Sequence, residues 1–310
     1  MQEAISDRVR IRMHDQGIFY INSLKFTKYR YRDRKIIYSQ FQSLLSYPQI
    51  SHFIFTRWGG YSKRPFHELN VSFWVGDREE DVRQNISLIK DISGAKRIIF
   101  LNQIHSDKIV CIKSGEEDYC KEDGDGIITD IPSIALMIKV ADCQSIFMFD
   151  PKRGVVGNIH NGWRGAVRNV LSRAVHLFME EFNSSPSDIL CYISPSLGPC
   201  CAEFRSYSEI FPKEFESFKM DKFHFNLWDI SKYQLREAGI PKENIEISRI
   251  CTRCRSDLFY SFRREGITGR SATLIMLSRP LHNPSLYWGL HPPSGSDDPP
   301  GRRPDPQKLT

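Results

Sequence analysis

The sequence predicts a single α/β domain with mixed sheets and a proline-rich C-terminal tail. Three observations favour this fold class: eight short runs rich in β-branched residues, three segments with helical periodicity, and no regular strand-helix-strand repeat. Irregular alternation of strands and helices is typical of mixed sheets and argues against a Rossmann or barrel fold. The 310 residues, 40% hydrophobic and 26% charged, have the composition of an ordinary globular protein.

The predicted strands are short apolar runs flanked by Gly, Pro or Asp. They cover residues 52–57, 97–101, 108–113, 134–140, 145–149, 154–159, 189–193 and 272–277. An apolar stripe at helical spacing predicts a helix over 163–182. A second helix should begin at Asp77 as N-cap, with Glu80 as its capping partner. A third should cover 228–238 and end at Gly239.

Composition divides the chain into three parts. We expect an N-terminal extension at 1–50 packed on the domain, a catalytic metal-binding domain at 50–283, and a tail at 284–310. The tail holds 7 of the 17 prolines. Because such a segment buries too little surface to offset its ordering entropy, it is predicted to be disordered.

Charge and hydropathy limit the class of partner and the location. The 43 basic and 37 acidic residues are scattered along the chain, which favours an anionic small molecule over nucleic acid as ligand. No window approaches the roughly 18 apolar residues of a membrane span, and residues 1–30 lack the apolar core of a signal peptide. The sequence therefore predicts a cytoplasmic protein whose eight cysteines are reduced.

Three segments place a metal-capable side chain at the end of a predicted strand: His105, Cys143 and His160. Separated single ligands are typical of catalytic zinc sites, whereas zinc fingers carry close pairs. For any one of them, a buried core residue is the alternative. The segment His160–Gly165, HNGWRG, lies between a strand and a helix start and carries Arg164. Glycines, a helix N-terminus and an arginine together favour an anion such as phosphate.

These segments resemble the YfiH-like family, which is called the laccase-domain or multicopper polyphenol oxidase family and is also described as purine nucleoside phosphorylases. The motifs follow family order over about residues 50–277. They are Thr56-Arg57, Gly59-Gly60-Tyr61-Ser62, Leu69-Asn70, Val75-Gly76-Asp77, Val82, Asn85, Gln103, His105, Asp125-Gly126, Thr129, Ala141-Asp142-Cys143, HNGWRG, Ser194-Pro195-Ser196, Cys251-Thr252, Tyr260-Ser261-Phe262-Arg263-Arg264 and Gly269-Arg270.

The resemblance implies that His105, Cys143 and His160 bind a metal, usually zinc, with copper as the alternative. It also implies a single layered α/β/β/α domain. The implied activities are phosphorolysis of purine nucleosides, including methylthioadenosine, and deamination of adenosine. The chain departs from the family pattern at Val140, at Gln144-Ser145 and at Asn161, which puts substrate preference in question.

Residue chemistry suggests roles within such a site. Zinc with three protein ligands keeps an open position, where bound water drops in pKa from about 15.7 to near 7. Deamination by that water needs a carboxylate to move the proton. Asp142 is the candidate, and orientation of a metal-bound histidine is its alternative role. For phosphate we expect Arg57, Arg164 and Arg270, which lie in glycine-containing motifs, with a structural charge as the alternative for each.

Two further features are ambiguous. The CxxC motif Cys251–Cys254 and the adjacent Cys200-Cys201 could hold a second zinc, but vicinal cysteines suit tetrahedral ligation poorly and a second CxxC is missing. The sequence therefore favours a single metal. The aromatic residues near the TRWGG motif are expected to pack in the core rather than stack on a purine. They are Trp58, Phe66, Phe73 and Trp74.

Two competing functions follow from the same residues. The first is a copper-dependent phenol oxidase, but laccases reduce oxygen with several coppers and many histidines, and this chain has nine histidines in all. The second is a non-catalytic partner-binding domain that retains a metal. The arginines and the open metal position favour an enzyme over that domain.

Overall fold

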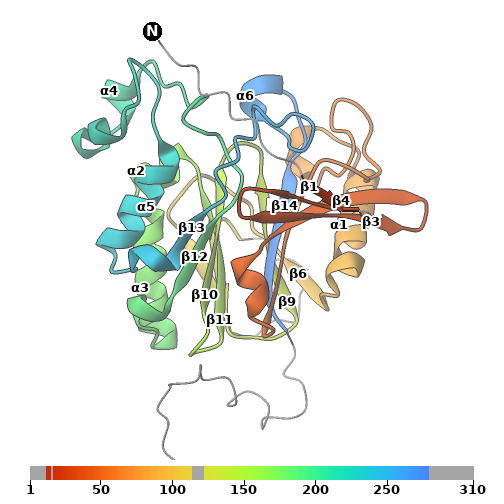
Figure 1. The fold of residues 1–310 in the computed structure, drawn as a ribbon, viewed down its shortest axis with the longest axis horizontal. Coiled ribbons are helices and arrows are strands. Elements are labelled where there is room, and N and C mark those ends of the chain that lie inside the picture. Colours follow the sequence, from red (N-terminus) through yellow and green to blue (C-terminus); the bar gives the residue numbers. More distant parts are fainter. Residues whose placement is uncertain (1–11, 15–16, 114–121, 279–310) are drawn as a thin grey trace, which may run out of the picture. The chain divides into compact units, whose positions relative to one another are not determined.

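Two mixed β-sheets form the centre of the fold (Figure 1). The structure, a computed structural model, describes residues 12–14, 17–113 and 122–278. The predicted tail at 284–310 lies outside these residues. The larger sheet has eight strands, in spatial order β1 (Arg12–His14), β2 (Ile18–Ile21), β3 (Leu24–Tyr31), β4 (Arg34–Phe41), β5 (Ile50–Phe55), β14 (Ser271–Leu277), β9 (Ile134–Val140) and β6 (Arg97–Ile99).

The smaller sheet has six strands. In spatial order they are β13 (Ile245–Ile247), β12 (Leu190–Ile193), β10 (Gln144–Asp150), β11 (Val155–Asn161), β8 (Gly126–Thr129) and β7 (Ile109–Ile112). Its centre is the antiparallel β10–β11 hairpin, in which Gln144 pairs with Asn161 and Asp150 with Val155. The pairs β12–β13 and β7–β8 are parallel, so this sheet is mixed, as is the larger one through β6 and β9.

Strand alternation creates a core on each face of each sheet. On β10, Phe147 and Phe149 join a cluster between the sheets, while Ile146 and Met148 point to the other face. On β14, Ile275 belongs to the same central cluster and its neighbours face outward. Because side chains alternate along a strand, every residue of these strands is buried on one side or the other.

Helices cover the two outer faces. Helices α3 (Val170–Phe182) and α5 (Leu227–Glu237) pack on the smaller sheet, and α1 (Glu79–Ser93) packs on the larger one (Figure 1). This is the predicted α/β/β/α arrangement, which is thereby confirmed. The remaining helices are short: α2 (Trp163–Val167), α4 (Tyr207–Ile210), α6 (Phe262–Glu265), η1 (Ser43–Ser46), η2 (Phe73–Val75), η3 (Pro186–Asp188), η4 (Lys213–Phe218) and η5 (Lys242–Asn244).

Two helix predictions need correction. The single helix expected over 163–182 is broken into α2 and α3, because Asn169 adopts a left-handed φ of 55° that no α-helix continues through. Asp77 is not the N-cap of α1. Arg78 holds that position, and the Asp77 carboxylate instead accepts a hydrogen bond from Asn70 Nδ2 at 2.8 Å. By contrast, α5 ends close to its predicted end. Its last residue is Glu237, its C-cap is Ala238, and Gly239 follows with a left-handed φ of 95°.

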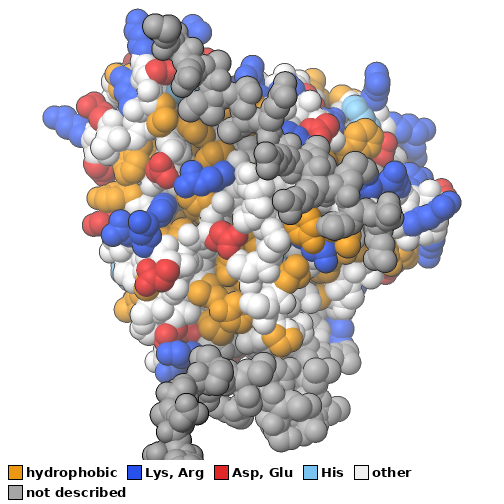
Figure 2. Space-filling view, in the orientation of Figure 1, with side chains coloured by type: hydrophobic (Ala, Val, Ile, Leu, Met, Phe, Trp, Pro, Cys, Tyr) orange, Lys and Arg blue, Asp and Glu red, His pale blue; other side chains and the backbone are white. Residues whose placement is uncertain are grey.

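None of the described helices could span a membrane, and the face shown in Figure 2 carries charged side chains of both signs. Among the helices in the described ranges, none combines the length and the hydrophobicity that crossing a bilayer requires. Figure 2 shows acidic and basic side chains interspersed over the helices at the left of the view. Basic side chains gather at the opposite edge, over β3 and β4 (Figures 1 and 2).

Candidate metal centre and its pockets

The structure brings His105, Cys143 and His160 together. Their ligand atoms lie within 4.8 Å of one another. His160 is the penultimate residue of β11, Cys143 immediately precedes β10, and His105 lies on the loop that follows β6. The β10–β11 pairing places Ser145 opposite His160, so the thiol and the imidazole meet at one end of the hairpin.

Two residues beside the cluster have unusual backbone conformations. His105 has a φ of 56° and Asp142 a φ of 89°, in the left-handed region that non-glycine residues rarely occupy. Such conformations persist where surrounding contacts over-determine them, and they concentrate at functional sites. At Asp142 those contacts include a hydrogen bond from Leu197 N to the Asp142 carbonyl oxygen at 2.8 Å. The backbone at His105, and at the residue before Cys143, is therefore held in an uncommon conformation.

Asp125, just before β8, is the carboxylate that orients the cluster. It is fully buried, and its Oδ1 lies 2.7 Å from His160 Nδ1. It also accepts hydrogen bonds from the backbone N–H groups of His105 at 3.0 Å and Ser106 at 2.5 Å. A carboxylate on one imidazole nitrogen fixes the ring and leaves the other nitrogen for a metal. Asp125 lies in one of the family motifs, but its role could not be assigned from the sequence alone.

Gly162 makes room for the ligands. A Cβ built at this position would lie 2.8 Å from Cys143 Sγ and 3.3 Å from His105 Nδ1. Any side chain would therefore displace the thiol or the imidazole. The glycines of HNGWRG were expected to let the backbone approach a ligand, and Gly162 does so toward the protein's own metal-capable groups.

The protonation of the two imidazoles differs because their neighbours differ. Burial lowers the pKa of His105 to about 4, helped by the positive charge of His160. For His160, burial opposes the charged form, but the Cys143 thiolate and the Asp125 carboxylate outweigh it and raise the pKa. The donor set consists of two imidazoles and a thiolate, and a buried carboxylate orients the imidazole of His160. Such a donor set fits zinc.

Two pockets meet at this cluster. One has a volume of about 300 Å³ and the other about 270 Å³. Both are lined by His105, Ala141, Cys143 and Phe262. The 300 Å³ pocket also contains Ser72, Trp74, Val75, Asn102, Gln103, Lys139, His160 and Arg270. The 270 Å³ pocket also contains Asp142, Gln144, Asn161, Gly162, Trp163, Arg164, Leu197, Phe204, Leu227 and Arg263.

Lys139 is a buried cation in the 300 Å³ pocket that the sequence analysis missed. Its Nζ donates to the Leu101 carbonyl at 2.8 Å and lies 4.3 Å from the ring centre of Trp74. Burial lowers its pKa to about 7. A lysine inside the apolar run of residues 134–140 was the available signal. Trp74 is 61% exposed and Trp58 is also exposed, so the prediction that they pack in the core is wrong, whereas Phe66 is buried as expected.

Arg164 and Arg270 each line one of the pockets. The positive charges of both lower the pKa of His105, so both lie close to the cluster. Arg270 donates to the carbonyls of Thr268 and Gly269 at 2.9 and 3.1 Å. Arg164 is exposed, and its guanidinium lies 4.3 Å from the Trp163 ring centre. Within the described ranges, neither guanidinium has an ion pair with a carboxylate.

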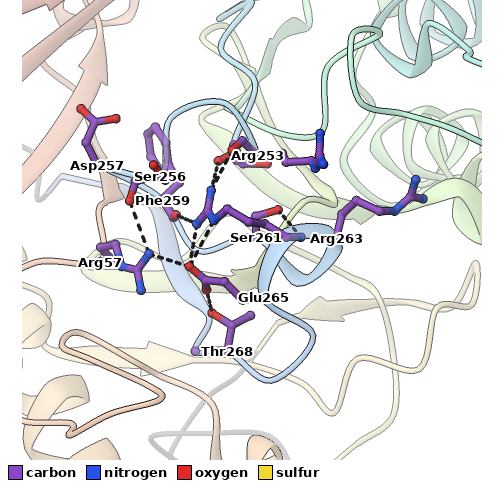
Figure 3. A network of polar contacts seen from close by, with 12 residues as sticks. Arg57, Arg253, Ser256, Asp257, Phe259, Ser261, Arg263, Glu265 and Thr268 are labelled. Atoms are coloured by element: carbon purple, nitrogen blue, oxygen red, sulfur yellow. Dashed lines mark hydrogen bonds and ion pairs between the residues drawn. The ribbon is translucent and has the colours of Figure 1, made fainter.

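Arg57 lies elsewhere and has a structural partner. Its Nη1 donates to Glu265 Oε1 at 2.8 Å, and its guanidinium lies 4.9 Å from the Tyr260 ring centre. Figure 3 shows this ion pair within a network that also includes Thr268. Arg57 lines neither pocket. The predicted phosphate contact of Arg57 therefore has no geometric support, because Glu265 already neutralises its charge.

Asp142 lines the 270 Å³ pocket, but both its oxygens accept hydrogen bonds. Oδ1 accepts from Thr252 Oγ1 and Oδ2 from the backbone N–H of Arg263, each at 2.7 Å. Among the described residues, no hydrogen bond joins the Asp142 carboxylate to either histidine, and the carboxylate at His160 is Asp125. Asp142 instead fixes the turn that carries Cys143.

Comparisons with known proteins show the family of this chain. A family described as "Multi-copper polyphenol oxidoreductase laccase" matches residues 51–278. The chain belongs to this family. A relative from Bacteroides thetaiotaomicron, named "Purine nucleoside phosphorylase", is 30% identical over 261 residues, which is 77% of this chain and 96% of the relative. One from Geobacillus stearothermophilus, named "Purine nucleoside phosphorylase YlmD", is 31% identical over 71% of this chain and 87% of its own.

Solved structures of family members share the fold. The Bacillus licheniformis hypothetical protein YfiH superposes with a TM-score of 0.72 at 26% identity, covering 86% of this chain and 99% of its own. YlmD from Geobacillus stearothermophilus also gives a TM-score of 0.72, at 28% identity over 81% of this chain and 99% of its own. The predicted resemblance to the YfiH-like family is confirmed.

Proposed function

We propose that this chain is a zinc-dependent purine nucleoside phosphorylase, which also acts on methylthioadenosine and deaminates adenosine at the same centre. The single observation that carries the proposal is the His105, Cys143 and His160 cluster, which opens on two pockets that each carry an arginine. Relatives named purine nucleoside phosphorylase support the reaction class.

The protein's contribution to the metal site is orientation and fit. His105, Cys143 and His160 would hold the zinc, which supplies Lewis acidity and an open coordination position. Asp125 holds the His160 ring by its Nδ1 at 2.7 Å. Burial lowers the pKa of His105 to about 4, which favours the neutral form that binds a metal.

The two arginines near the cluster are the proposed phosphate contacts. Phosphorolysis needs a phosphate beside the ribose, and guanidinium groups bind phosphate through paired hydrogen bonds. Arg164 and Arg270 have no carboxylate partner among the described residues, so their charges are available to an anion. Trp74, exposed at the 300 Å³ pocket, offers an apolar face on which a purine can stack. Arg57 has no part in this proposal.

For deamination we keep Asp142 as the carboxylate that would move the proton, because no other described Asp or Glu lines either of the two pockets. Hydrogen bonds from Thr252 and Arg263 N hold its oxygens in place. Adenosine conversion needs no phosphate. It should therefore depend on the metal ligands and much less on Arg164.

A laccase-like oxidation is the weaker alternative. Efficient oxygen reduction by laccases uses several coppers with many histidine ligands. In the described part of the chain, one metal-capable cluster contains histidine and the other contains only cysteines. Of the remaining described histidines, His52 is buried and its Nε2 accepts from Phe41 N at 2.8 Å.

Replacing Arg164 with Ala tests the phosphate assignment. We expect inosine phosphorolysis at subsaturating phosphate to slow by about ten- to a hundredfold, because a charge-assisted contact contributes roughly 1.5 to 3 kcal/mol. Adenosine-to-inosine conversion should fall much less. Products are separated by chromatography with and without phosphate, and metal content is measured for every variant.

Arg173→Ala is the matched control. Arg173 is an exposed arginine of α3, the helix that follows the one carrying Arg164. Its Nη1 lies 3.7 Å from Glu180 Oε2. The Arg173→Ala variant should leave both inosine phosphorolysis and adenosine deamination unchanged. Equal loss of both activities in a fully metallated Arg164→Ala protein would overturn the phosphate assignment. Phenol oxidation by a copper-loaded protein, with no release of purine base from any nucleoside, would overturn the proposed function.

A further inference from the structure

Four cysteines form a second cluster, distinct from the one described above. Cys200, Cys201, Cys251 and Cys254 place their sulfur atoms within 4.8 Å of one another. Cys254 Sγ lies 3.6 Å from Cys200 Sγ and 3.5 Å from Cys201 Sγ. A tetrahedron of sulfurs around zinc, with bonds of about 2.3 Å, has edges of about 3.8 Å. The sulfurs are thus spaced as the corners of a zinc site require.

The local backbone explains how adjacent cysteines can both take part. Cys200 and Cys201 follow Gly198 in a tight turn, closed by a hydrogen bond from Cys201 N to the Gly198 carbonyl at 2.9 Å. A Cβ at Gly198 would lie 3.0 Å from Cys251 Cβ, so only glycine lets this turn approach the CxxC motif. Vicinal cysteines were expected to suit tetrahedral ligation poorly, but this turn brings both sulfurs into the cluster.

Hydrogen-bond donors already point at the sulfur atoms. The Gly198 N–H donates to Cys251 Sγ at 3.3 Å, and Arg253 Nη1 donates to Cys201 Sγ at 3.4 Å. Four thiolates and a divalent zinc carry a net charge of −2, which donors and a nearby cation stabilise. Arg253 lies within the CxxC motif itself, between two of the sulfurs in sequence.

A disulfide explains this arrangement less well. An S–S bond is about 2.05 Å long, and both measured distances at Cys254 are much longer. One disulfide would also use two sulfurs and leave two thiols beside it. Four sulfurs around a common centre are accounted for by a single tetrahedral ion.

The cluster joins a loop that lines the 270 Å³ pocket to a second loop that contacts Asp142 of that pocket. The first loop follows β12 and carries Leu197 and Phe204, which line that pocket. The second carries Thr252, whose N–H donates to the Ser196 carbonyl at 3.0 Å and whose Oγ1 donates to Asp142. An ion bound to both loops would hold Thr252, and through it Asp142, the residue before Cys143.

We propose that Cys200, Cys201, Cys251 and Cys254 bind a structural zinc ion, which fastens these two loops beside the catalytic pocket. The site is closed, with four protein ligands and no open position, so it supplies stability and not chemistry. It is independent of the proposed function, because it shares no ligand with the first cluster.

Zinc content per chain tests the proposal directly. Proteins are purified under reducing conditions, loaded with zinc and freed of loosely bound metal. We expect two zinc ions in the natural protein and one in Cys143→Ala, which loses the first site. Cys254→Ser should also retain one, and Cys111→Ser, a half-buried thiol outside both clusters, should retain two.

Spectroscopy of the Cys143→Ala protein identifies the ligands. X-ray absorption should show zinc with sulfur neighbours alone at about 2.3 Å. Cobalt substitution should give the strong thiolate-to-metal absorption of a four-sulfur site. These two measurements on the Cys143→Ala protein decide whether four cysteines bind the metal, even if Cys254→Ser fails to fold. A Cys143→Ala protein that folds and binds no zinc would overturn the proposal, as would nitrogen or oxygen neighbours around its metal.

Discussion

Replacement of Asp125 by Asn tests the assignment of the buried carboxylate. In the natural protein this side chain accepts hydrogen bonds from His160 Nδ1 and from the backbone N–H groups of His105 and Ser106. It also accepts from Ser106 Oγ at 2.8 Å. Asn keeps the size of Asp125 but replaces one acceptor oxygen with an NH2 group and removes the negative charge. At least one donor would then face another donor.

The expected magnitude follows from these contacts. Loss of a partner that orients a metal-bound histidine costs about ten- to a hundredfold in metal affinity, equivalent to about 1.4 to 2.7 kcal/mol. The measured loss should approach the upper figure, because Asp125 is fully buried and also holds the His105 backbone. The change should also destabilise the metal-free protein by about 1 to 3 kcal/mol, since it leaves a buried donor unpaired.

The assay is zinc competition with a chromophoric chelator, together with thermal unfolding of the metal-free and zinc-loaded proteins. Asp123→Asn is the matched control, because its Oδ1 accepts from the half-buried Asn102 Nδ2 at 2.7 Å and neither residue belongs to the ligand cluster. That variant should bind zinc as the natural protein does. If folded Asp125→Asn bound zinc with natural affinity, Asp125 would have no part in holding the metal ligand.

Two further predictions concern pH. Burial lowers the pKa of Lys139 from 10.5 to about 7, so the unfolded chain binds more protons between these values and stability should rise with pH across that window. Denaturant unfolding should show that the free energy of unfolding rises with pH in the natural protein and rises less in Lys139→Met. An equal rise in both proteins would disprove the lowered pKa of Lys139. His52 has its pKa lowered by burial from 6.5 to about 3, so stability should fall as pH drops from 6.5 toward 3. His52→Gln, which keeps an acceptor for Phe41 N, should weaken that acid sensitivity in thermal melts, and an unaltered acid profile would contradict the assignment.

Local pattern found eight of the fourteen strands in the described residues, but it missed β1 to β4, β8 and β13. The buried runs became strands close to their predicted bounds, and β9 spans Ile134–Val140 as expected, because a strand buried on both faces is a nearly continuous apolar run. The break between α2 and α3 was not visible. Asn169 tolerates both helical and left-handed backbone, so its φ of 55° depends on the packing around it.

The sequence by itself determined the donor types of the site and the order in which they occur along the chain. Histidine and cysteine at strand ends indicated a metal, since few other side chains combine ligand atoms with such placement. Only the tertiary structure decided which carboxylate serves the histidine and which arginines face the pockets. Asp125 and Asp142 are equivalent in type, but β8 delivers Asp125 to His160, whereas the turn before Cys143 directs Asp142 to Thr252. Hydrogen bonds between residues far apart in sequence depend on distances of a few ångströms, which strand pairing fixes and residue type does not.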